Sequence, residues 1–331
     1  MNKVINLKSR PEGKPTLDNF EFLEIEKPEP KDGEILLKSL YVSVDPYLRG
    51  RMRDAESYIP PFEIDKPMAS AVVAEVVESK NDDFNKGDYV SGMLAWKIWQ
   101  AHNGKGLQKV DQNKADLSAY LGILGMTGIT AYLGLEKIGK PQEGETLLVS
   151  GASGAVGSTV GQIGKIKGCR VVGIAGTDEK VQAIQNKFGF DTGINYKTTE
   201  DMTAAIRKTC PDGVDVYFDN VGGETLDAAM SNIARDGRVV NCGAISTYNA
   251  EETLTGPRYE GILIKKSVKM QGFTIGDFHD DFQDAIKQLS QWLQADKLTY
   301  SETIVEGFDN IPQAFLDLFE GKNKGKMVVK V

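Results

Sequence analysis

The chain has few of the side chains that usually hold metals. Its 331 residues include two histidines, His102 and His279, and no C-x-x-C pair or close pairing of histidine with cysteine occurs. Since zinc sites are built mainly from those ligands, we expect no metal site. The odd number and wide spacing of Cys169, Cys210 and Cys242 argue against a disulfide framework and indicate buried, reduced thiols.

Long apolar runs and an excess of positive charge are also absent. No stretch is long enough to span a bilayer, and the first residues lack the apolar centre of a signal peptide. Lysine and arginine total 39 against 47 acidic residues, a net charge of −8, which argues against nucleic acid or an anionic membrane as the main partner. We therefore expect a cytoplasmic protein.

A glycine-rich turn is the most informative stretch. Residues 146–150 have the pattern of a strand buried on both faces, and a helical pattern and a second apolar run at 170–175 follow the turn. Between them, residues 151–157 read Gly-Ala-Ser-Gly-Ala-Val-Gly. Glycines at such a turn allow a tight bend, close approach of a pyrophosphate and close helix packing, and the helix N-terminus attracts phosphate. The pattern predicts dinucleotide binding, with packing alone as the alternative.

The end of the second strand bears on the choice between NAD and NADP. An NAD site usually places an acidic residue there, but Gly176 takes that position and Thr177 and Lys180 follow it. A 2′-phosphate needs donors and positive charge, which these two residues supply. If Thr177 or Asp178 only capped the next helix and Lys180 were solvated, the missing acid would remain unexplained. We therefore predict NADP(H).

Strand and helix patterns alternate beyond this point, which predicts a doubly wound parallel sheet with helices on both faces. Strands are predicted at 193–196, 214–219, 237–242 and 268–275, and helices at 181–188, 200–210, 224–233 and 279–295. Ligands bind outside the carboxyl ends of such strands. The candidates after those ends are Asn220, Gly243, Ala244, Ser246, Thr247 and Tyr248.

Short strands separated by turn residues characterise the first third of the chain. Apolar runs at 20–25, 33–44, 70–77 and 88–93 predict a small β domain or distorted barrel. A glycine-rich helical stretch at 117–139 follows, and its glycines indicate close approach of a backbone or ligand, or close packing alone.

The last part of the chain is predicted to complete this first domain. Its strands at 302–305 and 326–331 and its helix at 311–319 no longer follow the alternation. The nucleotide-binding part would then be an insertion, with a cleft between two lobes. We place the domains at 1–120, 121–298 and 299–331.

Four motifs in the same order resemble one enzyme family. They read GMTGITAY at 125–132, GAVG at 154–157, FDNVGG at 218–223 and CGAISTYN at 242–249. The chain resembles the zinc-independent medium-chain dehydrogenase/reductases, in particular the prostaglandin reductase, leukotriene hydroxydehydrogenase and alkenal double-bond reductase branch. The resemblance implies a GroES-like catalytic domain plus a Rossmann domain, a homodimer, and NADPH-dependent reduction of the carbon–carbon double bond of an α,β-unsaturated aldehyde or ketone.

The resemblance also implies which residues contact the cofactor. Those around the pyrophosphate and 2′-phosphate would be Gly154, Ala155, Val156, Gly157, Lys180 and Tyr196. Those along the riboses and nicotinamide would be Asn220, Cys242, Gly243, Ala244, Ile245, Ser246, Thr247, Tyr248, Phe273, Thr274, Ile275 and Asn323.

Three residues are candidates for the catalytic chemistry. Tyr47 lies in an Asp-Pro-Tyr motif whose tyrosine faces the substrate pocket in the family, although it could be simply a half-buried tyrosine at a strand end. Relatives often carry an enolate-stabilising tyrosine in the strand segment before the position of Met270, where this chain has Lys265. Tyr259 precedes it and could reach the same space from a loop, whereas Lys265 could also be a solvated charge.

Two other functions remain open at this stage. One is a quinone reductase of the same superfamily, and the other is a non-catalytic NADPH-binding protein. Dependence of NADPH consumption on an enal or enone would distinguish the predicted reductase from both.

Overall fold

The described chain, residues 1–252 and 254–331 of a computed structural model, separates into two units. The first consists of Met1–Gly122, Glu302–Asn323 and Met327–Val331, and we call it the β-rich unit. The second consists of Ile123–Ser301 and Lys324–Lys326, and we call it the parallel-sheet unit. Each unit therefore includes residues from the C-terminal part of the chain.

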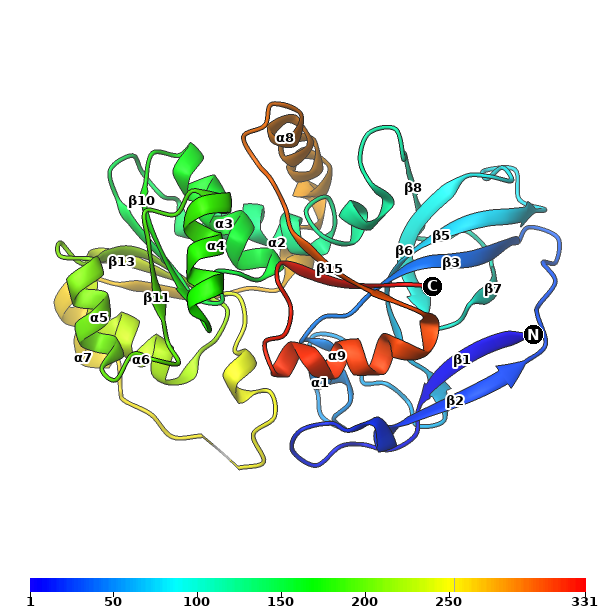
Figure 1. Cartoon of the computed structure of the whole chain (residues 1–331), viewed down its shortest axis with the longest axis horizontal. Coiled ribbons are helices and arrows are strands. Elements are labelled where there is room, and N and C mark those ends of the chain that lie inside the picture. Colours follow the sequence, from blue (N-terminus) through cyan, green and yellow to red (C-terminus); the bar gives the residue numbers. More distant parts are fainter. Residues whose placement is uncertain (253) are drawn as a thin grey trace. The chain divides into compact units, whose positions relative to one another are not determined.

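The parallel-sheet unit has the strand order β11-β10-β9-β12-β13-β14. Figure 1 labels three of these strands, β10, β11 and β13. Numbered along the chain, this order is 3-2-1-4-5-6, the arrangement of dinucleotide-binding folds, and the neighbouring strands are parallel. The predicted doubly wound sheet is confirmed. The strands are β9 Thr146–Val149, β10 Arg170–Ala175, β11 Thr192–Asn195, β12 Val214–Asp219, β13 Ile233–Asn241 and β14 Lys269–Gly272.

Helices cover both faces of this sheet because side chains alternate along each strand. Leu147 and Val171 lie against Gly164 of helix α3, where an added Cβ would be 2.5 Å from Leu147. Leu148 and Val172 point the other way, into a core cluster that includes residues of α5 and α6. The helices of this unit are α2 Met126–Leu133, α3 Ala155–Ile166, α4 Asp178–Phe188, α5 Met202–Thr209, α6 Gly223–Ser231, α7 Glu260–Lys266 and α8 Phe282–Gln294.

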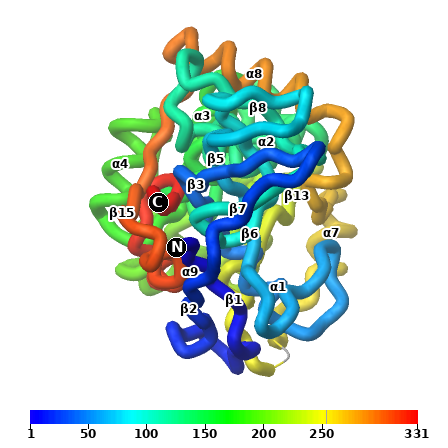
Figure 2. Tube along the Cα trace, turned by 90° about the vertical axis from the view of Figure 1, so that its right-hand side faces the viewer, coloured from blue at the N-terminus to red at the C-terminus, as the bar shows by residue number. Residues whose placement is uncertain are grey.

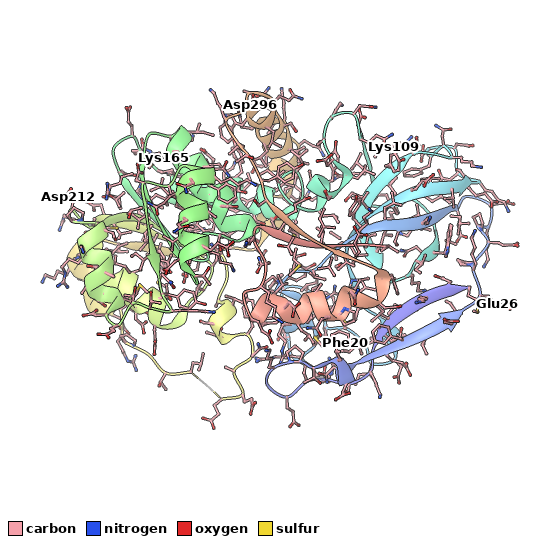
Figure 3. The ribbon with its side chains drawn as sticks, in the orientation of Figure 1. Phe20, Glu26, Lys109, Lys165, Asp212 and Asp296 are labelled. Carbon is pink, nitrogen blue, oxygen red and sulfur yellow. The ribbon has the colours of Figure 1, made fainter. Side chains whose placement is uncertain are left out.

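The end of α3 is tied to the sheet by charged contacts. Lys165 (Figure 3) contacts both carboxylate oxygens of Asp191 at 2.9 Å, and the same carboxylate accepts from the Val171 N–H at 2.7 Å. The helix that follows the glycine turn is thereby held at its far end by the two strands beside it.

Two stretches differ in detail from the prediction. The predicted helix at 279–295 begins only at Phe282, because a 3-10 helix, Ile275–Asp281, precedes it and is opened by reciprocal bonds between Thr274 and Asp277. The glycine-rich stretch 117–139 is divided into a 3-10 turn, α2 and a π-helical turn. Its Gly128 packs closely on backbone: an added Cβ would lie 1.9 Å from the Ile123 carbonyl oxygen.

The β-rich unit is built from antiparallel strands, such as the pair β1 and β2, which lie side by side in Figures 1 and 2. One sheet has the order β2-β1-β4 and the other β15-β16-β3-β5-β6-β8, with β7 paired to β3. Its elements are β1 Asn2–Leu7, β2 Phe20–Ile25, β3 Ile35–Ser43, α1 Leu48–Arg51, β4 Lys66–Pro67, β5 Ala69–Ser79, β6 Tyr89–Ala95, β7 Trp99–His102, β8 Gln108–Val110, β15 Glu302–Glu306, α9 Ile311–Phe319 and β16 Lys326–Lys330.

Aromatic side chains fill the centre of the β-rich unit. Phe20, labelled in Figure 3, stacks on the fully buried Trp96 and meets Phe315 of α9 edge-on, with ring centroids 6.4 Å apart in both pairs. Residues from both ends of the chain therefore share one core. Of the helices formed by the described residues, none is both long enough and apolar enough to cross a membrane.

The packing at Gly128 generates a stability prediction. Replacement of Gly128 with alanine forces α2 away from Ile123, and overpacking of this kind costs about 1–3 kcal/mol. We expect a lower denaturant midpoint than for the wild type. Gly261→Ala, on helix α7 with nothing within 4 Å of the new Cβ, is the matched control and leaves the midpoint unchanged or slightly raised. Equal midpoints for both variants would contradict the packing assignment.

Candidate cofactor site of the parallel-sheet unit

The glycine turn between β9 and α3 forms a cradle that is closely packed at Gly151 and Gly157. Gly151 has a φ of +58°, a left-handed conformation that favours glycine. At Gly157 an added Cβ would lie 2.4 Å from the Gly151 carbonyl oxygen, so the first turn of α3 packs directly on the bend. Gly154 precedes α3 and offers no side-chain cap to its N-terminus. The turn therefore presents backbone N–H groups and the positive end of a helix.

Strand β12 ends beside this turn, where the strand order of the sheet reverses. The buried carboxylate of Asp219, 1% exposed, accepts from the Ser150 hydroxyl at 2.8 Å and the Tyr217 hydroxyl at 2.7 Å. The same oxygen accepts from the Val221 and Gly222 N–H groups, both at 3.0 Å. These bonds join the carboxyl ends of β9 and β12, the edge at which such sheets bind ligands.

The predicted site residue Asn220 is fixed between the two strand ends. Its amide nitrogen donates to the Ser150 carbonyl at 2.8 Å, and its backbone N–H donates to the Ser150 hydroxyl at 2.9 Å. An added Cβ on Gly151 would be 3.3 Å from the Asn220 Cβ. The structure therefore brings Asn220 and the glycine turn together.

The predicted stretch 242–248 folds against residues 219–221. The Cys242 and Gly243 N–H groups donate to the Asp219 carbonyl oxygen at 2.9 and 3.0 Å, and Ile245 donates to Asn220 at 3.3 Å. Burial, and then the Asp219 charge, raise the pKa of the Cys242 thiol to about 12, so this thiol is protonated at neutral pH. The stretch is a positioned loop at the carboxyl end of β13.

Three hydrogen bonds hold this loop in shape. The Ser246 hydroxyl donates to the Val221 carbonyl oxygen at 2.6 Å, and the Ala244 N–H donates to the Tyr248 hydroxyl at 3.2 Å. The Thr247 hydroxyl donates to Ala244 at 2.8 Å. Ser246 and Tyr248 thus tie the loop to the end of β12 and to itself.

The end of β10 gathers the residues predicted for the 2′-phosphate. Tyr196 lies over Gly176, where an added Cβ would be 3.0 Å from its ring. The Thr177 hydroxyl caps α4 by accepting from the Lys180 N–H at 3.2 Å, so the capping role of Thr177 is real. Lys180 is nevertheless half-buried, and burial, Lys197 and Lys324 lower its pKa. Thr177 therefore caps α4, and Lys180, Lys197 and Lys324 form a cationic cluster beside it.

Residues 273–275 lie against α2 and α8 of the same unit. The Phe273 ring would be 2.6 Å from a Cβ on Gly134, so this glycine makes space for it. Ile275 packs with Ile129 and Leu133, and the Thr274 N–H donates to Asp277 at 2.8 Å. This segment follows β14 at the carboxyl edge of the sheet.

The three candidate catalytic residues, and the predicted cofactor contact Asn323, lie in different parts of the fold. Tyr47 and Asn323 belong to the β-rich unit, where Tyr47 precedes α1 and packs against the core. Tyr259 precedes α7, and its hydroxyl donates to the Asp227 carboxylate. Lys265 was expected in a strand segment, but it lies near the end of helix α7, where its side chain is exposed. Tyr259 and Lys265 therefore stand near opposite ends of one short helix.

NADP(H) fits the residues of the parallel-sheet unit. The backbone at Gly151 and Gly157 is packed too closely for a side chain, and the N-terminus of α3 lacks a side-chain cap. The ammonium groups of Lys197 and Lys324 lie near enough to Lys180 to lower its pKa. Helix N-termini and clustered ammonium groups are features that bind phosphates in proteins, which agrees with the predicted contacts to a pyrophosphate and a 2′-phosphate.

Sequence reasoning missed three residues that shape this site. Asp219 lies in the quoted FDNVGG motif, so its position was visible but its role as a shared acceptor was not. Lys197 and Lys324 influence Lys180 through space, and no local pattern marks them.

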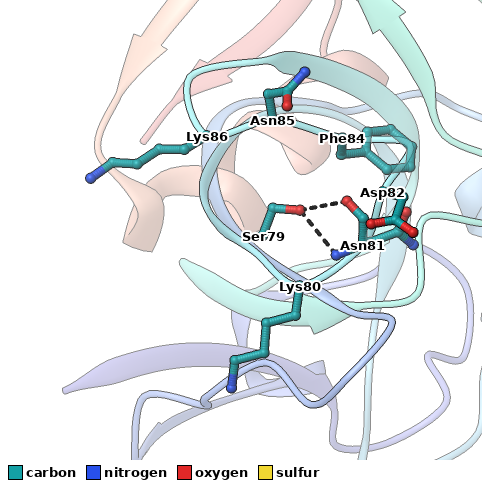
Figure 4. A pocket seen from close by; sticks show the side chains of 7 residues that line it. All are labelled: Ser79, Lys80, Asn81, Asp82, Phe84, Asn85 and Lys86. Carbon is teal, nitrogen blue, oxygen red and sulfur yellow. Dashed lines mark hydrogen bonds between the residues drawn. The ribbon is translucent and has the colours of Figure 1, made fainter.

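A small polar depression lies outside this edge of the sheet. A polar depression at the turn between β5 and β6 (Figure 4) has Ser79 and Asn81 bonded to each other. Its lining includes none of the predicted site residues: Ser79, Lys80, Asn81, Asp82, Phe84, Asn85 and Lys86. Within residues 1–252 and 254–331, no group of three or more His, Cys, Asp or Glu side chains could hold a metal ion.

The cationic cluster generates a prediction about cofactor choice. Lys180→Ala removes a charged donor from the predicted 2′-phosphate site, and a hydrogen bond to a charged group contributes about 1.5–3 kcal/mol. We expect NADPH to bind roughly 10- to 100-fold more weakly and NADH to be little affected, measured by titration calorimetry. Lys187→Ala, in the last turn of the same helix, is the control. Equal losses for the two coenzymes would remove Lys180 from the phosphate site.

Two family models match the chain. One is described as the N-terminal domain of oxidoreductase and matches residues 3–110, and the other is described as zinc-binding dehydrogenase and matches residues 155–291. The second match includes every strand of the parallel sheet except β9, although the part of the chain that the structure describes holds no metal cluster. This combination fits a zinc-independent branch.

Similar proteins match over nearly the whole chain. YfmJ of Bacillus subtilis, described provisionally as an NADP-dependent oxidoreductase, is 56% identical over 99% of this chain and 97% of its own. An NADP-dependent 2-alkenal reductase of Nicotiana tabacum is 41% identical over 100% of this chain and 97% of its own. The crystal structure of CurA from Vibrio vulnificus with NADPH has a TM-score of 0.95 and 44% identity, covering 99% of both chains.

These matches and the site agree on cofactor and fold. The strand order, the glycine cradle and the relatives described as NADPH-dependent assign NADP(H) as the coenzyme of this chain. The chain belongs to the zinc-independent medium-chain dehydrogenase/reductases, as an NADPH-dependent oxidoreductase of the alkenal, curcumin and prostaglandin reductase type.

Proposed function

We propose that this enzyme reduces the carbon–carbon double bond of α,β-unsaturated aldehydes or ketones. The observation that carries the proposal is the full-length similarity to a 2-alkenal reductase, since a 2-alkenal is an aldehyde whose double bond is conjugated to its carbonyl. Residues 1–252 and 254–331 offer no metal cluster that would polarise a carbonyl. We infer that hydrogen-bond donors of the chain stabilise the negative charge on the carbonyl oxygen.

The chemistry sets what the protein has to provide. NADPH, when bound, supplies a hydride to the β-carbon of the conjugated system. The electron pair of the double bond then moves toward the carbonyl oxygen, which carries the negative charge of an enolate. Hydrogen-bond donors aimed at that oxygen lower the barrier to hydride transfer. Water or a tyrosine then protonates the α-carbon.

Tyr47 is the tyrosine best suited to hydrogen-bond the enolate oxygen. Burial, and then the charge of Asp45, raise the pKa of its hydroxyl, and Arg51 opposes this only in part. The phenol therefore stays protonated over the physiological range and can donate a hydrogen bond. Asp45 is itself held by the Ser43 hydroxyl at the end of β3.

The other two candidates are less suited to this role. The Tyr259 hydroxyl already donates to the Asp227 carboxylate, so its proton is engaged within the parallel-sheet unit. Lys265 has an exposed side chain on α7, and its carbonyl oxygen accepts from Arg235 at 3.5 Å.

The homodimer implied by the family resemblance stays a prediction.

The test of the proposed reaction is where the hydride goes. Purified enzyme is given NADPH deuterated at nicotinamide C4 with a 2-alkenal, an enone and a quinone in separate reactions, and products are analysed by mass spectrometry and NMR. We expect a saturated aldehyde or ketone labelled at the β-carbon. An allylic alcohol as product would contradict the proposal. Turnover of the quinone alone would favour a quinone reductase, and no substrate-dependent NADPH oxidation a non-catalytic protein.

A second prediction concerns Tyr47. Tyr47→Phe removes one donor to the enolate oxygen, and loss of such a donor lowers kcat by about 10²–10³-fold. We expect that loss with an enone, while the Kd for NADPH is unchanged. Tyr89→Phe, on β6 of the same unit, is the matched control. Full turnover by Tyr47→Phe would remove Tyr47 from the reaction.

A further inference from the structure

A short segment from near the C-terminus lies on the glycine turn of the parallel-sheet unit. Gly325 forms a parallel bridge with Gly154, and its N–H donates to the Ser153 carbonyl oxygen at 2.9 Å. Lys326 donates from its N–H to the Ser301 carbonyl at 2.9 Å. Gly325 has a φ of +70°, and an added Cβ would lie 1.9 Å from the Ser301 oxygen. The position of Lys324 is therefore set by close backbone packing on either side of Gly325.

From this position Lys324 reaches the first turn of α4. Its ammonium contacts the Glu179 carboxylate at 2.5 Å, and Glu179 directly precedes Lys180 in the sequence. Both side chains of the pair are more than half exposed, at 56% and 71%. An ion pair this exposed is weak, so its partners can exchange readily for a better ligand.

Positive charges gather around Lys180, in the first turn of α4. Lys180 has its pKa lowered first by burial and then by Lys197 and Lys324, while Glu179 opposes them. The cluster therefore holds three ammonium groups against one carboxylate. Mutual repulsion of cations is relieved by an anion placed among them, and the 2′-phosphate is the anion of a bound NADPH that carries up to two charges.

We propose that Lys324 is a further specificity-determining residue for NADP(H), and that it exchanges the Glu179 carboxylate for the 2′-phosphate when the coenzyme binds. Glu179 then acts as a competitor built into the site. It keeps the cationic cluster partly neutralised without coenzyme and lowers the affinity for the phosphate. This inference rests on the NADP(H) site and not on the proposed substrate.

Opposite effects are expected for the two partners. Lys324→Met keeps the length of the side chain but removes its charge, and binding of NADP⁺ weakens by about tenfold. Glu179→Gln removes the competitor, and binding of NADP⁺ becomes a few-fold tighter. Neither change affects NAD⁺, which lacks the phosphate.

The experiment is titration calorimetry on the full-length protein with NADP⁺ and NAD⁺, and with 2′-AMP and 5′-AMP as fragments. Lys322→Met is the matched control, because Lys322 lies close by in sequence but contacts Asp317 at 2.8 Å in the β-rich unit. Lys324→Arg tests charge directly and retains most of the NADP⁺ affinity. The expected loss for Lys324→Met appears with NADP⁺ and 2′-AMP and falls as salt is raised.

Three outcomes would overturn the proposal. The first is unchanged NADP⁺ affinity in Lys324→Met. The second is an equal loss for NADP⁺ and NAD⁺, which would mean that Lys324 only supports the glycine turn. The third is a Glu179→Gln variant that binds NADP⁺ no more tightly than the wild type. Thermal midpoints of all variants show whether each is folded, and none of these readouts requires turnover of an enal.

Discussion

The shared use of one carboxylate oxygen of Asp219 is the constraint on which the candidate site depends. Two hydroxyl groups and two backbone N–H groups converge on it, from Ser150, Tyr217, Val221 and Gly222. A buried charge is costly unless it is fully hydrogen-bonded, and here the donors come from both strands that flank the point where the strand order reverses. The geometry of that point is therefore set before any ligand arrives.

The loops of the cofactor edge inherit their positions from this arrangement. Asn220 is held by Ser150, and the loop after β13 is held by the carbonyl groups of residues 219–221. Ser246 and Tyr248, which the family resemblance implies as cofactor contacts, use their hydroxyl groups partly to keep this loop in place. Preorganised loops lose less conformational entropy on binding. The same hydrogen bonds would thus serve both the fold and the coenzyme contacts that the family resemblance implies.

Much of this was readable from the sequence because it depends on local patterns. Apolar runs of strand length and the glycine spacing at 151–157 predicted the parallel sheet and its turn, and β12 has the predicted ends. The start of α8 was wrong by a turn, since Thr274 and Asp277 favour a 3-10 helix that has no distinct periodicity. Lys265 was expected in a strand segment and lies in a helix of seven residues, too short to show a period. The neighbours of Lys180 could not be predicted, because Lys324 approaches from the other end of the chain.

The nucleotide-binding half is not encoded by one continuous stretch. Residues 123–301 supply its sheet and helices, but Lys324–Lys326 belong to it as well and contact the glycine turn through Ser153. A fragment that ends at residue 301 would lack the segment Lys324–Lys326. A deletion of residues 324–331 would also remove this segment. During synthesis on the ribosome, the turn therefore acquires this neighbour only after residues 123–301 have all been added.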